Sequence, residues 1–250
     1  MSTGVQTAVG KFVWHENNST DVEKAASFYT ELVGWETEVW KPGEMDYPMI
    51  KAGDKTHGGF GTAEGGAPSH WLGHVLVENV DDTAERATQA GGKVVAGPFE
   101  IPEIGRMAVI ADPQGAILSA YASPTEGPQS EGVFVWDELV TTDVEAAKRF
   151  YSAVFGWKPR DMDMGEMTYT IFQSKGDVDV AGALPRPEGM EAPAALAAVH
   201  LHGRRRQNGR PGEAARRPCL HGGHRRPHCR PDRRSARLRR RGFRSLQADR

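Results

Sequence analysis

The chain has 250 residues, with 31 lysines and arginines, 33 aspartates and glutamates, and a formal net charge of −2. This length allows one large or two medium domains, and the absence of any run of about 18 apolar residues excludes an ordinary membrane-spanning helix. Because both cysteines lie near the C-terminus and the N-terminus does not resemble a signal peptide, we expect a cytoplasmic protein without disulfides or a membrane partner.

The first predicted elements are a strand and a helix. Phe12–Trp14 is a short apolar run that suits a strand with one buried face. Ser19–Asp21 provides a helix N-cap, apolar residues follow at helical spacing from Val22 to Leu32, and Gly34 ends the helix. Three strands are predicted next, at residues 35–40, 47–51 and 58–61, which completes a βαβββ unit.

The same order of elements then repeats. A strand is predicted at 71–78, a helix at 80–90 and three strands at 93–96, 107–111 and 117–121. One domain is therefore expected to contain two βαβββ units in an α+β fold. Antiparallel strands with a single helix per unit argue against a doubly wound parallel sheet.

The first unit occurs twice in the chain. The segments "GKFVWHENNSTDVEKAASFYTELVGW" (10–35) and "GVFVWDELVTTDVEAAKRFYSAVFGW" (132–157) align without a gap. Between them lies "SPTEGPQSEG", whose composition is typical of a linker. The sequence predicts tandem domains, with domain 1 at 10–122, a linker at 123–131 and the first half of domain 2 at 132–193. The domains are expected to pair as a pseudo-dimer if the second is intact.

These motifs resemble the vicinal oxygen chelate superfamily, the glyoxalase, bleomycin-resistance and extradiol-dioxygenase group. The resemblance rests on "TDVEKAASFYTELVGW", "HWLGHVLVENVDD" and "ADPQGAILSAY", and it covers about 12–121 and 134–193. It implies that paired units curl into a cup around a small organic molecule, with isomerase, lyase, hydroxylase or dioxygenase chemistry. Because fold does not fix chemistry, a non-catalytic protein that sequesters a drug is the alternative.

The resemblance also implies where a metal such as Fe, Zn, Ni or Mn would bind. Metal-using members carry ligands on the first strand of each unit and on the last strand. The first-strand position holds His74 in the second unit, but Trp14 in the first unit and Trp136 in its repeat. The last-strand position holds Ser119. With one ligand left, no cofactor is secure, and we expect metal-independent or weakly metal-dependent function.

Glu16 and His74 are the candidate catalytic groups. Glu16 shares a strand face with Trp14 and recurs as Glu138, so a carboxylate in the cup is expected to act as base or anchor. An exposed acid at a strand end is the alternative for Glu16, and a hydrogen-bonded strand histidine is the alternative for His74. The candidate ligand-binding set is Trp14, Glu16, His74, Ser119, Tyr121, Trp136 and Glu138.

The segment 194–250 differs in composition from the rest of the chain. From Arg204 onward it contains 17 of the 31 bases and three of the 33 acids. A basic arm that binds nucleic acid is one interpretation, and a zinc site in "CLHGGHRRPHC" (219–229) is another. The cysteine and histidine spacing fits no common zinc finger, and we expect no specific nucleic-acid partner.

A frame shifted by one base is the third interpretation of this segment. At a constant offset of 125 residues, the shifted codons of Ala195–Ala197 can encode the His-Trp-Leu of 70–72. From Asn79 to Tyr121 the shifted frame permits the domain 1 residue at roughly half of the positions, more than twice the chance number. Val199 is the position equivalent to His74, and its shifted codon cannot encode histidine. We therefore predict a frameshift near 192–194, a second domain truncated to about one unit, and a disordered Arg-rich tail.

Overall fold

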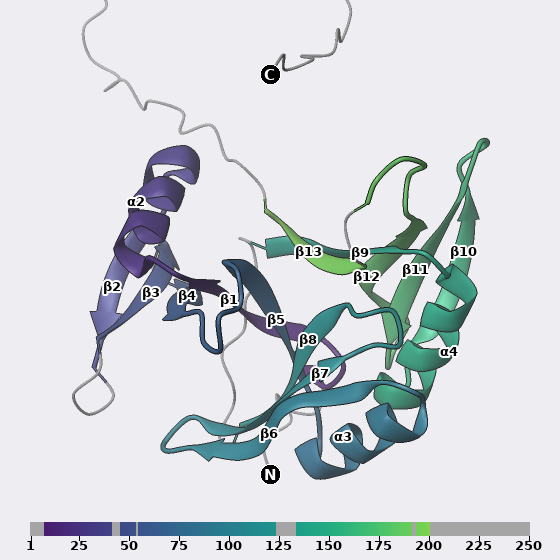
Figure 1. Ribbon diagram of the computed structural model, residues 1–250, viewed down its shortest axis with the longest axis horizontal. Coiled ribbons are helices and arrows are strands. Elements are labelled where there is room, and N and C mark those ends of the chain that lie inside the picture. Colours follow the sequence, from purple (N-terminus) through teal and green to yellow (C-terminus); the bar gives the residue numbers. More distant parts are fainter. Residues whose placement is uncertain (1–7, 42–45, 54, 124–133, 192–193, 201–250) are drawn as a thin grey trace, which may run out of the picture. The chain divides into compact units, whose positions relative to one another are not determined.

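The computed structural model describes residues 8–41, 46–53, 55–123, 134–191 and 194–200 (Figure 1). The first part contains β1 (Phe12–Ser19), α2 (Val22–Val33), β2 (Glu36–Trp40), β3 (Tyr47–Ala52), β4 (Lys55–Thr62), β5 (His70–Leu76), α3 (Val80–Gln89), β6 (Lys93–Ile101), β7 (Gly105–Ala111) and β8 (Ile117–Ala122). The second contains β9 (Phe134–Thr141), α4 (Val144–Phe155), β10 (Lys158–Asp163), β11 (Thr168–Ser174), β12 (Val178–Pro185) and β13 (Ala195–His200). None of the described helices is long and apolar enough to cross a membrane.

The strands of residues 12–122, the predicted domain 1, form one eight-stranded sheet. Its order is β2-β3-β4-β1-β5-β8-β7-β6, so the two βαβββ units join edge to edge through β1 and β5. Within each unit the first and last strands are parallel neighbours, β1 beside β4 and β5 beside β8, while the remaining pairs are antiparallel. The predicted α+β fold with paired βαβββ units is confirmed.

Local sequence explains where the helices begin and end. The Asp21 carboxylate accepts a hydrogen bond from the backbone N–H of Lys24 at 3.0 Å, which caps α2. Gly34 ends this helix at φ 74°, a left-handed conformation that favours glycine. Asp143 and Gly156 perform the same roles for α4, as expected from a gapless repeat.

Strand β1 is longer than the predicted Phe12–Trp14 and continues to Ser19. Its additional residues are polar, which concealed the strand from a search for apolar alternation. His15, Asn17 and Ser19 are nevertheless buried, because one face of β1 is covered by other elements.

A five-stranded sheet, β10-β11-β12-β9-β13, contains the second copy of the unit. Its last strand, β13, lies within the segment 194–250 for which the sequence predicted a disordered tail. Because a strand is held mainly by backbone hydrogen bonds, an altered side-chain sequence can still pair at a sheet edge. The remainder of that segment, 201–250, lies outside the described residues, as do most of the predicted linker and the candidate zinc ligands.

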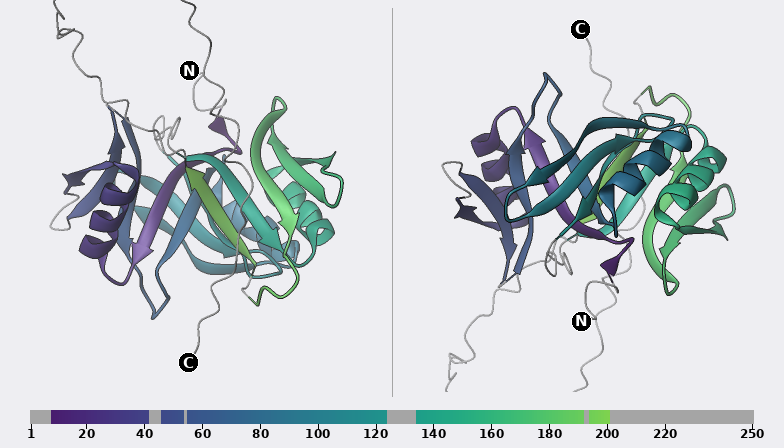
Figure 2. Two further views of the ribbon diagram at one scale, coloured as in Figure 1. Left: turned by 90° about the horizontal axis from the view of Figure 1, so that it is seen from above. Right: turned by 90° about the horizontal axis from the view of Figure 1, so that it is seen from below.

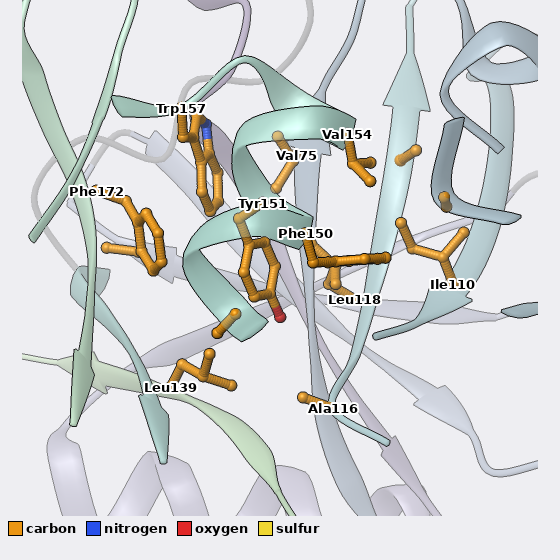
Figure 3. Close-up of a cluster of buried hydrophobic side chains, with 14 of the residues drawn as sticks. Val75, Ile110, Ala116, Leu118, Leu139, Phe150, Tyr151, Val154, Trp157 and Phe172 are labelled. Atoms are coloured by element: carbon orange, nitrogen blue, oxygen red, sulfur yellow. The ribbon is translucent and has the colours of Figure 1, made fainter. Parts of the chain in front are cut away.

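The largest buried cluster joins the two copies (Figure 3). Val75 and Leu118 from the first sheet contribute to it together with Phe150, Tyr151 and Trp157 from the second copy. Tyr151 stacks on Trp157 with ring centroids 5.5 Å apart. The largest core is therefore shared between the copies, in keeping with the described residues up to 200 belonging to one compact unit.

An aromatic residue at the start of each copy packs against a tryptophan of the other copy. Phe12 packs on Trp157 at 5.9 Å between ring centroids, and its counterpart Phe134 packs on Trp35 at 5.5 Å. His15 lies between these contacts and bonds through Nε2 to an oxygen of Asp137, its own counterpart, at 2.8 Å. Such reciprocal contacts are typical of an interface with two-fold symmetry, which here forms within one chain.

Candidate functional site

The candidate site lies on the face of the first sheet that is opposite the helices. On β1, Trp14 and Glu16 are half-buried and alternate with the buried His15 and Asn17, which face the other side. Residues directly opposite in an antiparallel pair project to the same face, so the pairing of Trp14 with His74 places His74 on this face. The parallel pairing of His74 with Ser119 extends the same row to β8.

A chain of hydrogen bonds links Trp14 to Glu16 through a residue on β3. Trp14 Nε1 donates to Tyr47 Oη at 3.2 Å, and Tyr47 Oη donates to Glu16 Oε1 at 2.8 Å. We call these three side chains the domain 1 cluster. Because the indole N–H, the tyrosine hydroxyl and one carboxylate oxygen are joined by hydrogen bonds, the indole ring and the carboxylate are held in orientation.

The domain 1 cluster depends on a glycine in β4. Gly59 lies beside Glu16 in the parallel β1–β4 pair. A Cβ atom at Gly59 would overlap the hydroxyl and ring of Tyr47. Glycine at this position therefore makes room for the tyrosine to reach across β4 to Glu16.

The second copy contains the same arrangement. Trp136 Nε1 donates to Tyr169 Oη at 2.7 Å, and Tyr169 Oη donates to Glu138 Oε2 at 2.9 Å. Gly182 takes the place of Gly59, since a Cβ atom there would overlap the Tyr169 hydroxyl. These side chains form the domain 2 cluster. The recurrence of one hydrogen-bond chain in both copies argues against an incidental contact.

The electrostatic environment of Glu16 is set by burial. Burial raises the pKa of the Glu16 carboxyl, while hydrogen bonds from Tyr47 and Asn18 and the nearby His70 lower it in part. Burial, together with the charge of Glu16, holds the pKa of the Tyr47 hydroxyl well above its ordinary value. Tyr47 therefore remains a hydrogen-bond donor, and Glu16, with its raised pKa, is the group of the cluster that can accept and release a proton.

His74 is buried and uncharged. Burial, with a smaller contribution from the charge of His15, lowers the pKa of His74 to about 3. Its Nε2 atom has no hydrogen-bond partner among the described residues. A buried ring nitrogen left in this way costs about 1–3 kcal/mol, which makes His74 a poor choice for a purely structural position.

Ser119 and Tyr121, the other members of the predicted set in domain 1, are tightly enclosed. Ser119 is fully buried. Tyr121 packs in a cluster with Val13, Leu76 and Met107, and its hydroxyl donates to the Ile104 carbonyl at 2.9 Å. At this end the open face is filled by side chains, which leaves the half around the domain 1 cluster as the better candidate for ligand contact.

The residues present do not fit the metal site that the resemblance implies. His74 faces Trp14 on one neighbouring strand and Ser119 on the other, and neither can replace a missing carboxylate or imidazole ligand. Glu16, a carboxylate on the same face of β1 as Trp14, accepts a hydrogen bond from Tyr47. Within the described ranges, no three His, Cys, Asp or Glu side chains gather closely enough to hold a metal ion.

Tyr47 and Gly59 are site residues that the sequence analysis missed. The gapless repeat continues past Trp35 and Trp157, since "GEMDY" at 43–47 matches "GEMTY" at 165–169. Extending the comparison by twelve residues reveals the tyrosine in both copies. Its bond to Glu16 was not predictable, because it requires the spacing of β3 and β1 across a glycine in β4.

Sequence models of two families match the chain. That of the Glyoxalase/Bleomycin resistance protein/Dioxygenase superfamily matches residues 14–119, and that of the bleomycin resistance protein-like N-terminal family matches 134–172. Among curated proteins, the anthracycline biosynthesis protein DnrV of Streptomyces peucetius is 33% identical over 195 residues, which cover 70% of each chain.

Solved structures share the fold at low sequence identity. The Mn(II)-bound glyoxalase from Novosphingobium aromaticivorans aligns with a TM-score of 0.54 at 18% identity, covering 72% of this chain and 63% of that one. A variant of homoprotocatechuate 2,3-dioxygenase from B. fuscum aligns with a TM-score of 0.51 at 17% identity, covering 71% and 55%. These likenesses concern the fold alone.

Proposed function

Because the chain belongs to the Glyoxalase/Bleomycin resistance protein/Dioxygenase superfamily, we propose that it binds a small, flat organic molecule against the domain 1 cluster. The observation that carries this proposal is the hydrogen-bond chain from Trp14 through Tyr47 to Glu16 on the open face of the sheet. Trp14 is held by its indole N–H, which leaves the ring faces for stacking on a ligand. Glu16 supplies an oriented acceptor for a ligand hydroxyl.

The substrate class proposed is a planar, hydroxylated aromatic compound. One relative is named as an anthracycline biosynthesis protein, and anthracyclines contain a fused aromatic ring system with phenolic hydroxyls. A fused ring suits stacking on Trp14, and a phenolic hydroxyl suits donation to Glu16. Trp136 and Glu138 are proposed to contact a second, weaker ligand in the incomplete second domain.

The reaction proposed is proton transfer rather than metal-assisted chemistry. Glu16 takes a proton from a ligand hydroxyl or from an acidic C–H group, and its raised pKa brings this exchange closer to neutral pH. Tyr47 orients the carboxylate by donating to one of its oxygens. His74 is proposed to assist from the neighbouring strand as an unprotonated imidazole, consistent with its lowered pKa.

A titration of the full chain with a fluorescent anthracycline aglycone, in the presence of a chelator, tests this proposal. Fluorescence anisotropy is expected to report saturable binding, and Glu16→Gln and Tyr47→Phe are each expected to weaken it by about 5–100-fold, the value of one hydrogen bond. Glu138→Gln is the matched control and leaves the stronger affinity unchanged. Binding that requires a divalent ion, or that is equally sensitive at Glu138, contradicts the proposal.

Sequestration without turnover is the second candidate function. It is favoured by the match of residues 134–172 to the bleomycin resistance protein-like model. Analysis of the incubated ligand by chromatography and mass spectrometry separates the two candidates. A ligand recovered unchanged from a chain that binds it supports sequestration, and a product that disappears with Glu16→Gln supports catalysis.

A further inference from the structure

The two copies contain equivalent helices whose apolar faces differ in exposure. In α4, Phe150 and Val154 are each 1% exposed. Their counterparts in α2, Phe28 and Leu32, are 56% and 54% exposed, and no residue of α2 is fully buried. Exposed apolar side chains on one face of α2 indicate a helix that packs against another element, and no described residue covers that face. We call Phe28 and Leu32 the α2 face.

The second unit of domain 1 covers the corresponding face of α4. Helices α3 and α4 lie side by side in Figures 1 and 2, while α2 stands apart from both. Phe150 lies against Gly92, where a Cβ atom would approach the phenyl ring to 2.7 Å. Arg86 of α3 donates from Nε to the Val154 carbonyl at 3.1 Å, and Asp112 accepts from the Tyr151 hydroxyl at 3.3 Å.

Among the described residues, α2 and α4 are equivalent helices that each need a covering helix, and α3 is the one helix available to cover them. Since α3 is already packed on α4, a second copy of the chain brings no free α3 for the α2 face. The reciprocal contacts around His15 and Asp137 relate α2 to α4 by the same pseudo-two-fold symmetry. That symmetry implies a fourth βαβββ unit, equivalent to residues 70–121 and beginning with β13.

Strand β13 shows where such a unit begins. It pairs with β9 in the register that β5 has with β1, since Val199 faces Trp136 as His74 faces Trp14. The register irregularity recurs too, with His200 opposite Phe134 as Val75 is opposite Phe12. Val199 and His200 each lie 125 residues after their counterparts on β5, His74 and Val75, and this is the offset at which the shifted frame resembles domain 1.

The shifted codons permit the residues that the docking requires. The four buried positions of α3 are Val80, Thr83, Ala84 and Ala87. In the shifted frame the codons of Arg205, Asn208, Gly209 and Gly212 permit these residues in turn, and the codon of Asn208 permits only Thr or Met. The contact residues Arg86, Gly92 and Asp112 are likewise permitted, by the codons of Pro211, Arg217 and Arg237. Gln114, which bonds to the start of α4, has no permitted counterpart.

We propose that the α2 face is the docking surface of a fourth βαβββ unit, encoded in the shifted frame of the codons for 195–246. In that unit an arginine at position 211 donates to the Leu32 carbonyl, a glycine at 217 receives Phe28, and an aspartate at 237 accepts from Tyr29. Among the described residues, the Tyr29 hydroxyl accepts a hydrogen bond from Trp71 Nε1 at 2.8 Å, so its own hydrogen can be donated to that aspartate.

The gene sequence provides the first test. After one base is deleted within codons 192–194, the frame is expected to stay open through codon 246 and to encode Arg, Gly and Asp at the three contact positions. A stop codon before 246, or other residues at two of these positions, overturns the proposal.

The second test is amide hydrogen exchange of two proteins. One is the 250-residue chain with its present sequence, called here the chain as written, and the other is the chain encoded after the one-base deletion, called the restored chain. As written, the amides of α2 are expected to exchange much faster than those of α4, and in the restored chain both helices are expected to be protected alike. Equal protection in the chain as written overturns the proposal, and so does a restored chain that is less soluble than the original.

Matched substitutions identify what covers the α2 face. Phe28→Glu is expected to change the Tm of the chain as written by no more than about 2 °C, but to lower that of the restored chain by roughly 10 °C. Phe150→Glu, the control, is expected to lower both. A dimer of the chain as written that Phe28→Glu dissociates, seen by sedimentation velocity, shows that a second copy is the occupant and overturns the proposal.

Discussion

Glu16 illustrates how a single carboxyl group acquires its properties from its neighbours. Its position on β1 follows from strand alternation, and its raised pKa follows from burial. Tyr47 opposes that rise by donating a hydrogen bond to the ionised form. The same three residue types recur in the domain 2 cluster, so each measurement on Glu16 has an internal control.

Removal of the Tyr47 hydroxyl is expected to raise the pKa of Glu16 further. The Tyr47→Phe substitution deletes a donor that favours the carboxylate, so protonation becomes easier. Carbon-13 NMR of the glutamate side chains over a pH series measures the change. Tyr169→Phe is the control and leaves the Glu16 titration in place; an unchanged Glu16 titration in Tyr47→Phe refutes the assignment.

His74 is expected to make stability depend on pH. The unfolded chain protonates this imidazole near pH 6.5, whereas the folded chain does so only at about pH 3. As the pH falls from about 6.5 to about 3, the unfolded state binds the additional proton, and the free energy of unfolding falls by up to about 1.4 kcal/mol per pH unit. Denaturant titrations at several pH values measure this slope.

His74→Leu is expected to remove most of that dependence, while His70→Leu, which changes a more exposed histidine on the same strand, is expected to retain it. Equal slopes in the two variants would show that another group controls acid destabilisation.

At the scale of elements, the sequence predicts most strands and helices because local patterns determine them. Capping residues and helical spacing locate α2, α3 and α4 to within a few residues. The polar half of β1 escapes prediction, since His15 is buried by Asp137 and Phe134 of the other copy. In the candidate site, strand alternation and the internal repeat predict that Trp14 and Glu16 are site residues. The contact of Tyr47 with Glu16 is not predictable in this way, because it depends on the spacing of β3 and β1 in the folded sheet.

Two adjacent glycines in β4 are expected to respond differently to substitution. An added Cβ at Gly59 meets the Tyr47 side chain, whereas one at Gly58 meets the backbone carbonyl of His15. Both alanine variants are expected to lose about 1–3 kcal/mol of stability. Adding Tyr47→Ala is expected to relieve Gly59→Ala but not Gly58→Ala, because only the first clash is with a side chain. A double-mutant cycle of unfolding free energies measures this, and equal coupling of Tyr47 to both glycines would contradict it.

At the scale of the whole molecule, the copies stabilise each other because an aromatic side chain of each copy packs against aromatic residues of the other. Phe134 belongs to the second copy but completes the cluster of Trp35, Ile50 and Phe60 in the first. The repeat in the sequence reveals that the copies are equivalent, but not that they share buried clusters, because the contacts join residues far apart in the sequence, such as Trp35 and Phe134.

Phe134→Ala is therefore expected to destabilise the first domain by about 3–5 kcal/mol, the usual value for a buried phenylalanine. Hydrogen exchange of β3 and β4, combined with denaturant unfolding, locates the loss. Val135→Ala, at a neighbouring exposed position, is the control and is expected to cost under about 0.5 kcal/mol. Loss of protection confined to the second copy would show that the domains do not share this cluster.

The central claim, a small-molecule site at the domain 1 cluster, is tested most directly by the indole N–H signals of the six tryptophans. Proton–nitrogen NMR of the full chain in chelator, titrated with the anthracycline aglycone, follows them, and Trp14→Phe and Trp136→Phe assign two of the signals. The Trp14 signal is expected to shift first and saturably. A Trp14 signal that stays in place while another moves, or that moves only after a divalent ion is added, contradicts the account.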